Sequence, residues 1–76
     1  MTAEETRPRR AALKLLEVEQ LRNQAKYAIE DREFERARSA LNRARNLELE
    51  AQTLMKYATD EEQRKALVLE LENGYH

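Results

Sequence analysis

Apolar residues recur with helical spacing in three consecutive segments of this chain. In the first segment, from Pro8 to about Ile29, a helix at about 100° per residue gathers the apolar side chains into one stripe. The stripe consists of Ala11, Leu15, Val18, Leu21, Ala25, Ala28 and Ile29. Pro8 suits the first turn of a helix, where its missing N–H has no bond to make. The pattern predicts a helix whose stripe is core, preceded by a flexible tail over residues 1–7.

The second segment, from about Arg32 to Ala58, has the clearest period in the chain. An alanine recurs every seven residues, and larger apolar residues stand between. The alanines are Ala37, Ala44, Ala51 and Ala58, and the larger residues are Phe34, Leu41, Leu47, Leu54 and Met55. A seven-residue repeat keeps one seam facing a partner helix, and alanine lets the two backbones approach closely. Because Ala11, Val18 and Ala25 repeat in the same way, an antiparallel hairpin is the simplest fold, although the seam also suits pairing between two chains.

The turn of this hairpin is expected at residues 30–33, which contain no apolar residue. Asp31 is a competent N-cap for the second helix, and Glu33 and Glu35 supply negative charge to its first turn. No glycine marks the position, so one unbroken helix through Asp31 is the alternative.

A third helix is expected after Thr59, because Thr59 and Glu62 have the spacing of a capping box. Its predicted apolar stripe is Leu67, Val68 and Leu71, with Ala66 and Leu69 to the side. Asn73-Gly74 is a strong C-terminal stop signal. We expect this helix to break from the second rather than continue it with a kink. Residues 8–73 then form a single helical domain, followed by a C-terminal tail over residues 74–76.

The length of the chain, 76 residues, limits how much apolar surface one copy can bury. A domain of this size hides only about 60% of the surface that its unfolded chain exposes. Disulfides are excluded because the chain has no cysteine, so oligomerisation is the remaining source of stability. The sequence therefore predicts an all-α fold, an antiparallel hairpin plus a shorter third helix, assembled as a dimeric helical bundle. The candidate interface residues lie off the main stripes: Leu13, Leu16, Tyr27, Leu49 and Tyr57.

Residues that carry catalysis or bind metals are scarce in this sequence. The only histidine is His76 at the chain end, and the only glycine is Gly74, so neither a nucleophile with its base nor a phosphate-binding loop is indicated. We expect no enzyme activity, no metal site and no cofactor.

The charges are balanced, with 14 basic and 15 acidic residues and a formal net charge of −1. This balance argues against a chain-wide attraction to nucleic acid or to an anionic membrane. No stretch reaches the roughly 20 apolar residues needed to span a bilayer, and we expect a soluble, cytoplasmic protein. The alternative is a small dimeric DNA- or RNA-binding regulator, which would use two arginine clusters: Arg7, Arg9 and Arg10 with Arg36, Arg38 and Arg43.

Residues 21–47 resemble two known helical hairpins. They are similar to the UVR motif of excision-repair proteins and related protease-associated proteins, with Leu41-Asn42 where that motif usually carries an Arg-Asp pair. The positions that carry the resemblance are Leu21, Ala28, Glu33, Phe34, Glu35, Ala37 and Leu47. The same stretch resembles a single tetratricopeptide unit, in which Phe34, Ala37, Leu41 and Ala44 match the second helix. Both resemblances imply a hairpin that binds protein. We therefore expect a small adaptor, regulator or inhibitor of a larger protein, acting as a homodimer.

Overall fold

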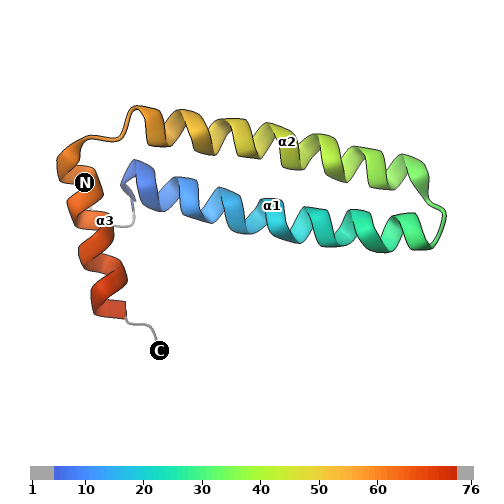
Figure 1. The fold of residues 1–76 in the computed structure, drawn as a ribbon, viewed down its shortest axis with the longest axis horizontal. Coiled ribbons are helices and arrows are strands. Elements are labelled where there is room, and N and C mark those ends of the chain that lie inside the picture. The colour runs from blue at the N-terminus through green and yellow to red at the C-terminus, as the bar shows by residue number, and fades with distance from the viewer. Residues whose placement is uncertain (1–4, 74–76) are drawn as a thin grey trace.

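The computed structural model describes residues 5–73, which form three helices. These are α1 (Arg7–Glu30), α2 (Phe34–Lys56) and α3 (Asp60–Asn73). Figure 1 shows α1 and α2 side by side and antiparallel, with α3 crossing the end of the hairpin at which α1 begins. The structure confirms the all-α class, the antiparallel hairpin and the shorter third helix. The tails expected at residues 1–4 and 74–76 lie outside the described residues.

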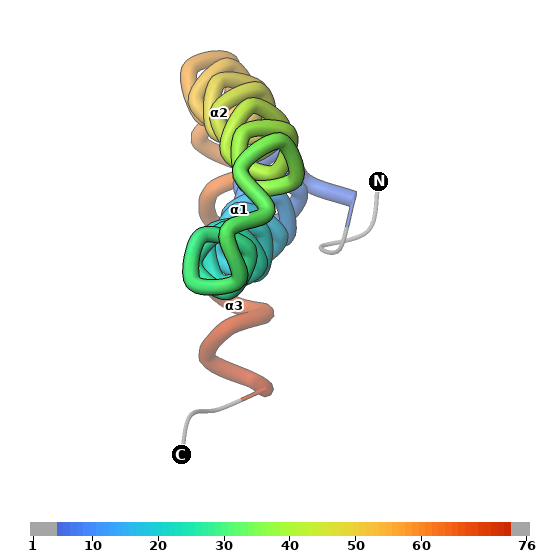
Figure 2. The backbone as a smooth tube through the Cα atoms, turned by 90° about the vertical axis from the view of Figure 1, so that its right-hand side faces the viewer, coloured from blue at the N-terminus to red at the C-terminus, as the bar shows by residue number. Residues whose placement is uncertain are grey.

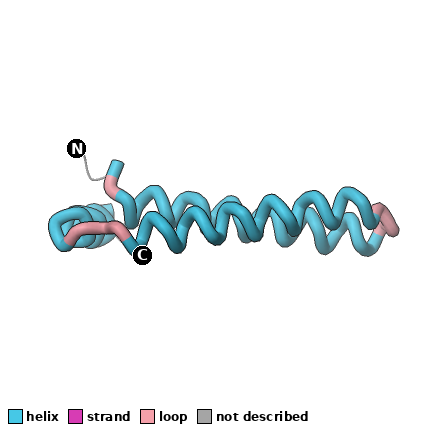
Figure 3. Tube along the Cα trace, turned by 90° about the horizontal axis from the view of Figure 1, so that it is seen from above, coloured by secondary structure: helices cyan, strands magenta, loops and turns pink. Residues whose placement is uncertain are grey.

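The molecule is a single layer of helices. Its Cα atoms span 46 × 29 × 14 Å, and the smallest of these dimensions is close to the diameter of one helix, about 10–12 Å. The end-on view of Figure 2 and the view from above in Figure 3 show the same thin arrangement. Helical domains normally bury their apolar stripes between two or more layers. Within residues 5–73, the helices contact one another at the seam of the hairpin and in a small area between α3 and α1.

The seam between α1 and α2 is built mainly of alanine. Its buried residues are Ala11, Val18, Leu21, Ala25 and Ala28 from α1, and Ala37, Ala44, Leu47 and Ala51 from α2. They form two clusters, one near the turn around Ala28 and Ala37 and one in the middle around Val18 and Leu47. Small side chains at seven-residue spacing let the helices pack closely. The predicted seam is confirmed for Ala37, Ala44 and Ala51, and the structure uses it within one chain. Ala58 lies beyond the end of α2 and is only partly buried.

Two residues predicted to be core, Leu15 and Ile29, are half-exposed instead. The seven-residue seam is narrower than the stripe drawn at 3.6 residues per turn, and each of these residues follows a seam alanine by four positions. They therefore lie on the flank of the seam. The same geometry leaves three larger residues of the α2 segment exposed: Phe34, Leu41 and Met55.

Ion pairs between α1 and α2 line both flanks of the seam. The guanidinium of Arg22 lies 2.9 Å from the Glu48 carboxylate on one flank, and that of Arg43 lies 3.3 Å from Glu17 on the other. In a heptad frame with the seam alanines at position a, the first pair joins two e positions and the second joins two g positions, as an antiparallel coiled coil requires. The charges therefore agree with the register that the alanines impose.

The hairpin turn lies at the expected place, but Asp31 does not cap the second helix. It is the C-cap of α1, and α2 begins at Phe34 with Glu33 as an N-cap that makes no side-chain hydrogen bond. The backbone N–H of Glu33 donates to the Ala28 carbonyl at 2.8 Å and that of Arg32 to the Ile29 carbonyl at 3.0 Å. This pair of bonds is a Schellman motif, and its left-handed residue is Arg32 with φ 63°. The prediction failed because a left-handed residue other than glycine leaves little trace in a sequence.

Arg32→Gly is expected to stabilise the fold by about 0.5–1 kcal/mol, because glycine adopts a positive φ without the steric cost that arginine bears. Chemical denaturation followed by circular dichroism measures the change. Ser39→Gly serves as the control on α2, where glycine is expected to cost about 0.5 kcal/mol. A lower stability of Arg32→Gly than of the parent chain would contradict this account of the turn.

The starts of α1 and α3 are both capped by a threonine. Thr6 accepts a hydrogen bond from the Arg9 backbone N–H at 3.4 Å and is fully buried. The helix thus begins at Arg7 rather than Pro8, and Thr6 and Arg7 are packed rather than part of a flexible tail. At α3, the Glu62 N–H donates to Thr59 Oγ1 at 3.1 Å and the Thr59 N–H donates back to Glu62 at 3.2 Å. The predicted capping box and the break between α2 and α3 are confirmed.

The face that α3 turns inward is not the predicted one. Leu67, Val68 and Leu71 are exposed, with Leu71 the most exposed of them. Glu62 is buried instead, and Ala66 and Leu69, which follow it on the same side of the helix, are partly buried. The orientation is set by the bonds of Glu62 to the start of α1, described below, which outweigh the burial of the leucines. No helix within residues 5–73 combines the length and the apolarity that crossing a bilayer requires.

Candidate interaction surface

One flank of the hairpin carries a row of large apolar side chains. Four of them follow a seam alanine by four residues, and Phe34 precedes Ala37 by three, so all lie at e positions of the heptad frame. The row, which we call the apolar face, consists of Leu15 and Ile29 from α1 and Phe34, Leu41 and Met55 from α2. All five are between 42% and 52% exposed. In a single layer of helices, no other part of the described chain covers them.

The opposite flank of the seam is polar. The corresponding g positions are Arg10, Glu17 and Gln24 on α1 and Arg36, Arg43 and Glu50 on α2. Glu17 pairs there with Arg43, and Glu50 lies 4.0 Å from the Lys14 ammonium. The g positions that border the seam on this flank are therefore charged or polar, whereas the e positions on the other flank carry the five large apolar side chains of the apolar face.

A shallow groove extends the apolar face onto α3. It has a volume of about 340 Å³, and its lining includes Ala11 and Leu15 from α1, Met55 from α2, and Ala66 and Leu67 from α3. Leu15 and Met55 belong to both the groove and a neighbouring hollow beside Glu48 and Ala51. The exposed Leu67 thus joins the same continuous apolar surface.

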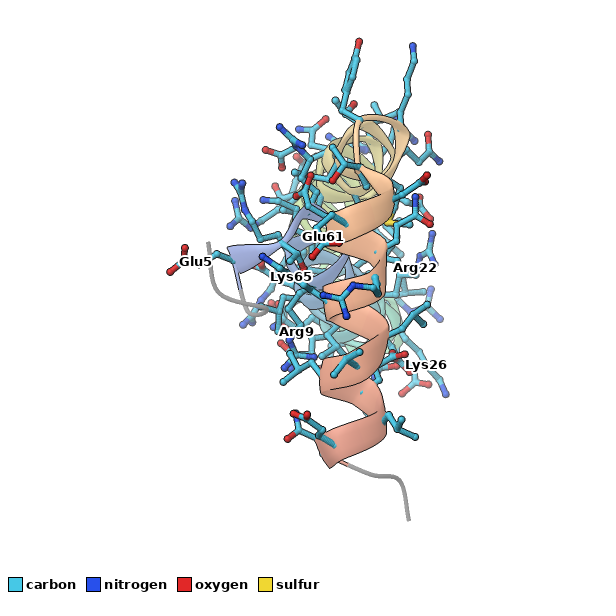
Figure 4. The ribbon with its side chains drawn as sticks, turned by 90° about the vertical axis from the view of Figure 1, so that its left-hand side faces the viewer. Glu5, Arg9, Arg22, Lys26, Glu61 and Lys65 are labelled. Carbon is cyan, nitrogen blue, oxygen red and sulfur yellow. The ribbon has the colours of Figure 1, made fainter. Side chains whose placement is uncertain are left out.

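The ion pair of Arg22 and Glu48 lies in the middle of the apolar face. It separates the Leu15 and Met55 end from the Ile29, Phe34 and Leu41 end. The side chain of Arg22 is 57% exposed and that of Glu48 is 37% exposed, so both can still meet groups from outside. Figure 4, which looks from the α3 end, shows Arg22 with Lys26 on one side of the hairpin and Glu5 with Arg9 on the other. Arg22 therefore lies on the side of the hairpin away from Glu5.

The five residues predicted as an interface are all exposed, but the structure does not bring them together on this face. They are Leu13, Leu16, Tyr27, Leu49 and Tyr57. In the heptad frame the first four fall at c and f positions, on the outer sides of α1 and α2. Tyr57 ends α2, where the Lys56 ammonium lies 5.5 Å from its ring centroid. The sequence pattern identified the residues of the apolar face as apolar positions, but they were assigned to the core. The seven-residue spacing of the alanines is the signal that separates seam positions from flank positions.

The six arginines of the nucleic-acid alternative are likewise spread over the molecule. Arg7 lies at the α3 end, where it pairs with Glu62. Arg36 and Arg38 lie at the turn end and pair with Glu33 and Glu35 at 3.4 and 3.2 Å. Arg9 and Arg10 accompany Arg7 at the start of α1, and Arg43 pairs across the seam. As the antiparallel arrangement predicts, no single basic stripe results.

The carboxylate of Glu62 joins the N-terminal ends of two helices. It accepts the Arg7 backbone N–H at 2.9 Å and the Thr59 backbone N–H at 3.2 Å, and it pairs with the Arg7 guanidinium. That guanidinium also donates to the Tyr57 carbonyl at 3.1 Å. Unpaired N–H groups and the helix dipole make each of these helix ends favourable for a negative charge. The Glu62 junction thereby fixes α3 against α1 beside the groove.

The Arg7 backbone N–H holds the pKa of Glu62 below its ordinary value of 4.5, and the Thr59 N–H and the Arg7 charge act in the same direction, against the effect of burial. A lowered folded-state pKa means that the junction stabilises the fold fully above about pH 4.5. This stabilisation is lost as the pH falls from there through the folded-state pKa.

Acidification below pH 4.5 is therefore expected to shift the Arg7 amide proton resonance and to release α3 before the hairpin unfolds. Amide hydrogen exchange measured by NMR reports both steps. Glu62→Gln should abolish the titration of the Arg7 amide and leave α3 unprotected at neutral pH. The neighbouring Glu61→Gln, which removes an exposed carboxylate paired with Arg64, should retain both. An Arg7 amide that still titrates in Glu62→Gln would contradict the assignment.

Comparison with known proteins finds no match for this chain among family models, curated proteins or solved structures. The resemblances of residues 21–47 to UVR and tetratricopeptide hairpins therefore stay predictions.

Proposed function

We propose that this chain is a protein-association module that works as a homodimer, in which the apolar face of one hairpin covers that of a second copy. The observation that carries the proposal is the row of half-exposed Leu15, Ile29, Phe34, Leu41 and Met55 along one side of a one-layer molecule. Large apolar side chains gathered on one face are typical of an interaction site. Scattered exposed leucines would carry no such meaning.

The energetics of the single chain support association. Most of the buried seam residues are alanines, and only Val18, Leu21 and Leu47 are larger. Burial of a valine or leucine contributes about 1.5–3 kcal/mol, whereas an alanine methyl contributes about 0.8 kcal/mol. A core of this kind gives little surplus over the conformational entropy of the chain. Covering the apolar face adds several large side chains to the core at once.

The size of the face also suits a stable dimer. A surface of two packed helices about 36 Å long and about 20 Å wide presents about 700 Å². Stable interfaces bury about 800 Å² on each partner. The groove beside Leu67 supplies additional apolar area at one end. Two copies of this chain would then form a four-helix bundle, in which each hairpin provides one of the two layers.

Such a dimer would act as a small adaptor or regulator of a larger protein. With the apolar faces covered, the outer sides of α1 and α2 stay accessible, and they carry the exposed Leu13, Leu16, Tyr27 and Leu49. Each surface would occur twice, related by the symmetry of the dimer. These residues are the ones we propose for contact with the larger partner.

Static light scattering over a concentration series tests the homodimer. The proposal expects a mass of twice the 9.0 kDa chain that falls only on strong dilution, together with loss of helical circular dichroism as the dimer dissociates. A folded 9.0 kDa species at every concentration would contradict the proposal.

A further inference from the structure

The ion pair in the middle of the apolar face gives that face a direction. Arg22 places a positive charge on the α1 side and Glu48 a negative charge on the α2 side, 2.9 Å apart. Above and below them along the hairpin, the face is apolar on both helices. A second copy that lies on this face thus meets the positive charge of Arg22 on one helix and the negative charge of Glu48 on the other. The apolar surface on both sides of this pair has no such direction.

Two symmetric ways of covering the face are open to a second copy. If the two-fold axis runs along the hairpin, α1 of one copy lies on α2 of the other, so Arg22 meets the partner's Glu48. If the axis runs across the hairpin, α1 lies on α1 of the partner, and Arg22 meets the partner's Arg22 while Glu48 meets the partner's Glu48. Both arrangements keep all neighbouring helices antiparallel, and both bring apolar residues onto apolar residues. The two arrangements differ in the charges that meet at the centre of the face.

We infer that the homodimer forms with its two-fold axis along the hairpin, and that Arg22 and Glu48 are the residues that select this orientation. The inference rests on the proposed homodimer. In the crosswise arrangement two like charges would approach each other in the middle of an apolar interface, where water no longer screens them. In the lengthwise arrangement each charge keeps its partner within the chain and gains an opposite charge from the second copy.

Charges on the rim of the face have less influence on the orientation of the dimer than Arg22 and Glu48. Glu19 and Lys26 lie at exposed b positions of α1, and the crosswise arrangement would bring them near each other. Exposed pairs of this kind are weak because they stay in water and are screened by salt. The buried centre therefore sets the orientation.

The lengthwise axis also places both α3 helices at the same end of the dimer. The groove lined by Leu15, Met55 and Leu67 then meets its own counterpart. In the crosswise arrangement it would meet the turn end of the second copy. This difference gives a second, independent way to distinguish the two arrangements.

A mixing experiment tests the inference. The double variant Arg22→Glu, Glu48→Arg keeps the ion pair within each chain but reverses its direction. The variant is mixed with the parent chain in equal amounts and equilibrated. In a mixed dimer of the lengthwise arrangement, Arg22 of the parent chain meets an arginine at position 48 of the variant, and Glu48 meets a glutamate at position 22, so like charges come together. Native mass spectrometry should then show mixed dimers depleted about tenfold from the statistical half at low salt, and recovering as salt rises.

The other outcomes are equally informative. If mixed dimers exceeded half of all dimers, the arrangement would be crosswise and the inference would be overturned. Mixed dimers at the statistical half would also overturn it, because the ion pair would then select neither orientation. In both cases the dimer itself, and so the proposed function, would stand. If the parent chain and the double variant were each monomeric before mixing, the result would contradict the proposed homodimer as well.

Cysteine cross-linking provides a second measurement, since the chain has no cysteine of its own. Leu15→Cys mixed with Met55→Cys should give an interchain disulfide under mild oxidation, because the lengthwise axis places these positions opposite each other. Leu15→Cys mixed with Ile29→Cys should give far less. The reverse preference would overturn the inference even if the charge-reversed variant failed to fold.

Discussion

Leu15→Glu is expected to raise the dissociation constant of the homodimer at least about 100-fold. Leu15 lies in the apolar face next to Met55 and borders the groove with α3. Burying a carboxylate there without a partner costs several kcal/mol, and each 1.4 kcal/mol is about a tenfold change in affinity. The two-fold symmetry places the substitution twice in one interface. Sedimentation equilibrium measures the dissociation constant directly.

Leu13→Glu is a closely matched control for this substitution. Leu13 is the same residue type on the same helix, two positions away, and it has the same exposed fraction of 47% in the single chain. It lies on the outer side of α1, so the same charge should change the dissociation constant by less than about threefold. Equal effects of the two substitutions would show that the apolar face is not the dimer interface.

Ala44→Leu is expected to destabilise the fold by about 3 kcal/mol or more. Ala44 is 2% exposed and packs in the middle of the seam with Val18, Leu21 and Leu47. A leucine there forces the two helices apart along the seam, and overpacking of this kind costs about 1–3 kcal/mol even in larger cores. Because leucine and alanine have similar helix propensities, the loss cannot come from the helix itself. Chemical denaturation measures it.

Ser39→Leu is the control for the seam. Ser39 is exposed on α2, away from α1, and a leucine at this position should change the stability by less than about 0.5 kcal/mol. If Ala44→Leu were as stable as Ser39→Leu, the close approach of the backbones would not be what holds the hairpin together.

The sequence was sufficient to predict the elements that local signals determine. The seven-residue spacing of Ala37, Ala44 and Ala51 led to the seam, and Thr59 with Glu62 led to the start of the third helix. These features depend on residues within one or two turns of each other, which a sequence displays directly.

The features that were missed depend on contacts between distant residues. Leu15 and Ile29 satisfy a helical stripe, and only the narrow alanine seam shows that they stand outside it. The inward face of α3 follows from Glu62 binding Arg7, which lies 55 positions earlier in the chain. The left-handed Arg32 has no sequence signal of the kind that a glycine would give. The residues of the apolar face were therefore found as apolar positions but assigned to the core, and the predicted interface residues Leu13, Leu16, Tyr27, Leu49 and Tyr57 stay a prediction.

In the proposed homodimer, a second copy covers the apolar face and leaves the outer side of α1 exposed. The direct test is an NMR measurement of how strongly a soluble paramagnetic probe attenuates the signal of each leucine methyl group. Leu13 and Leu15 are equally exposed in the single chain, so any difference between them comes from the second copy. We expect strong attenuation for the methyl groups of Leu13 and Leu16, and protection for those of Leu15 and Leu41. Equal attenuation of Leu13 and Leu15 at concentrations where the protein is folded would contradict it.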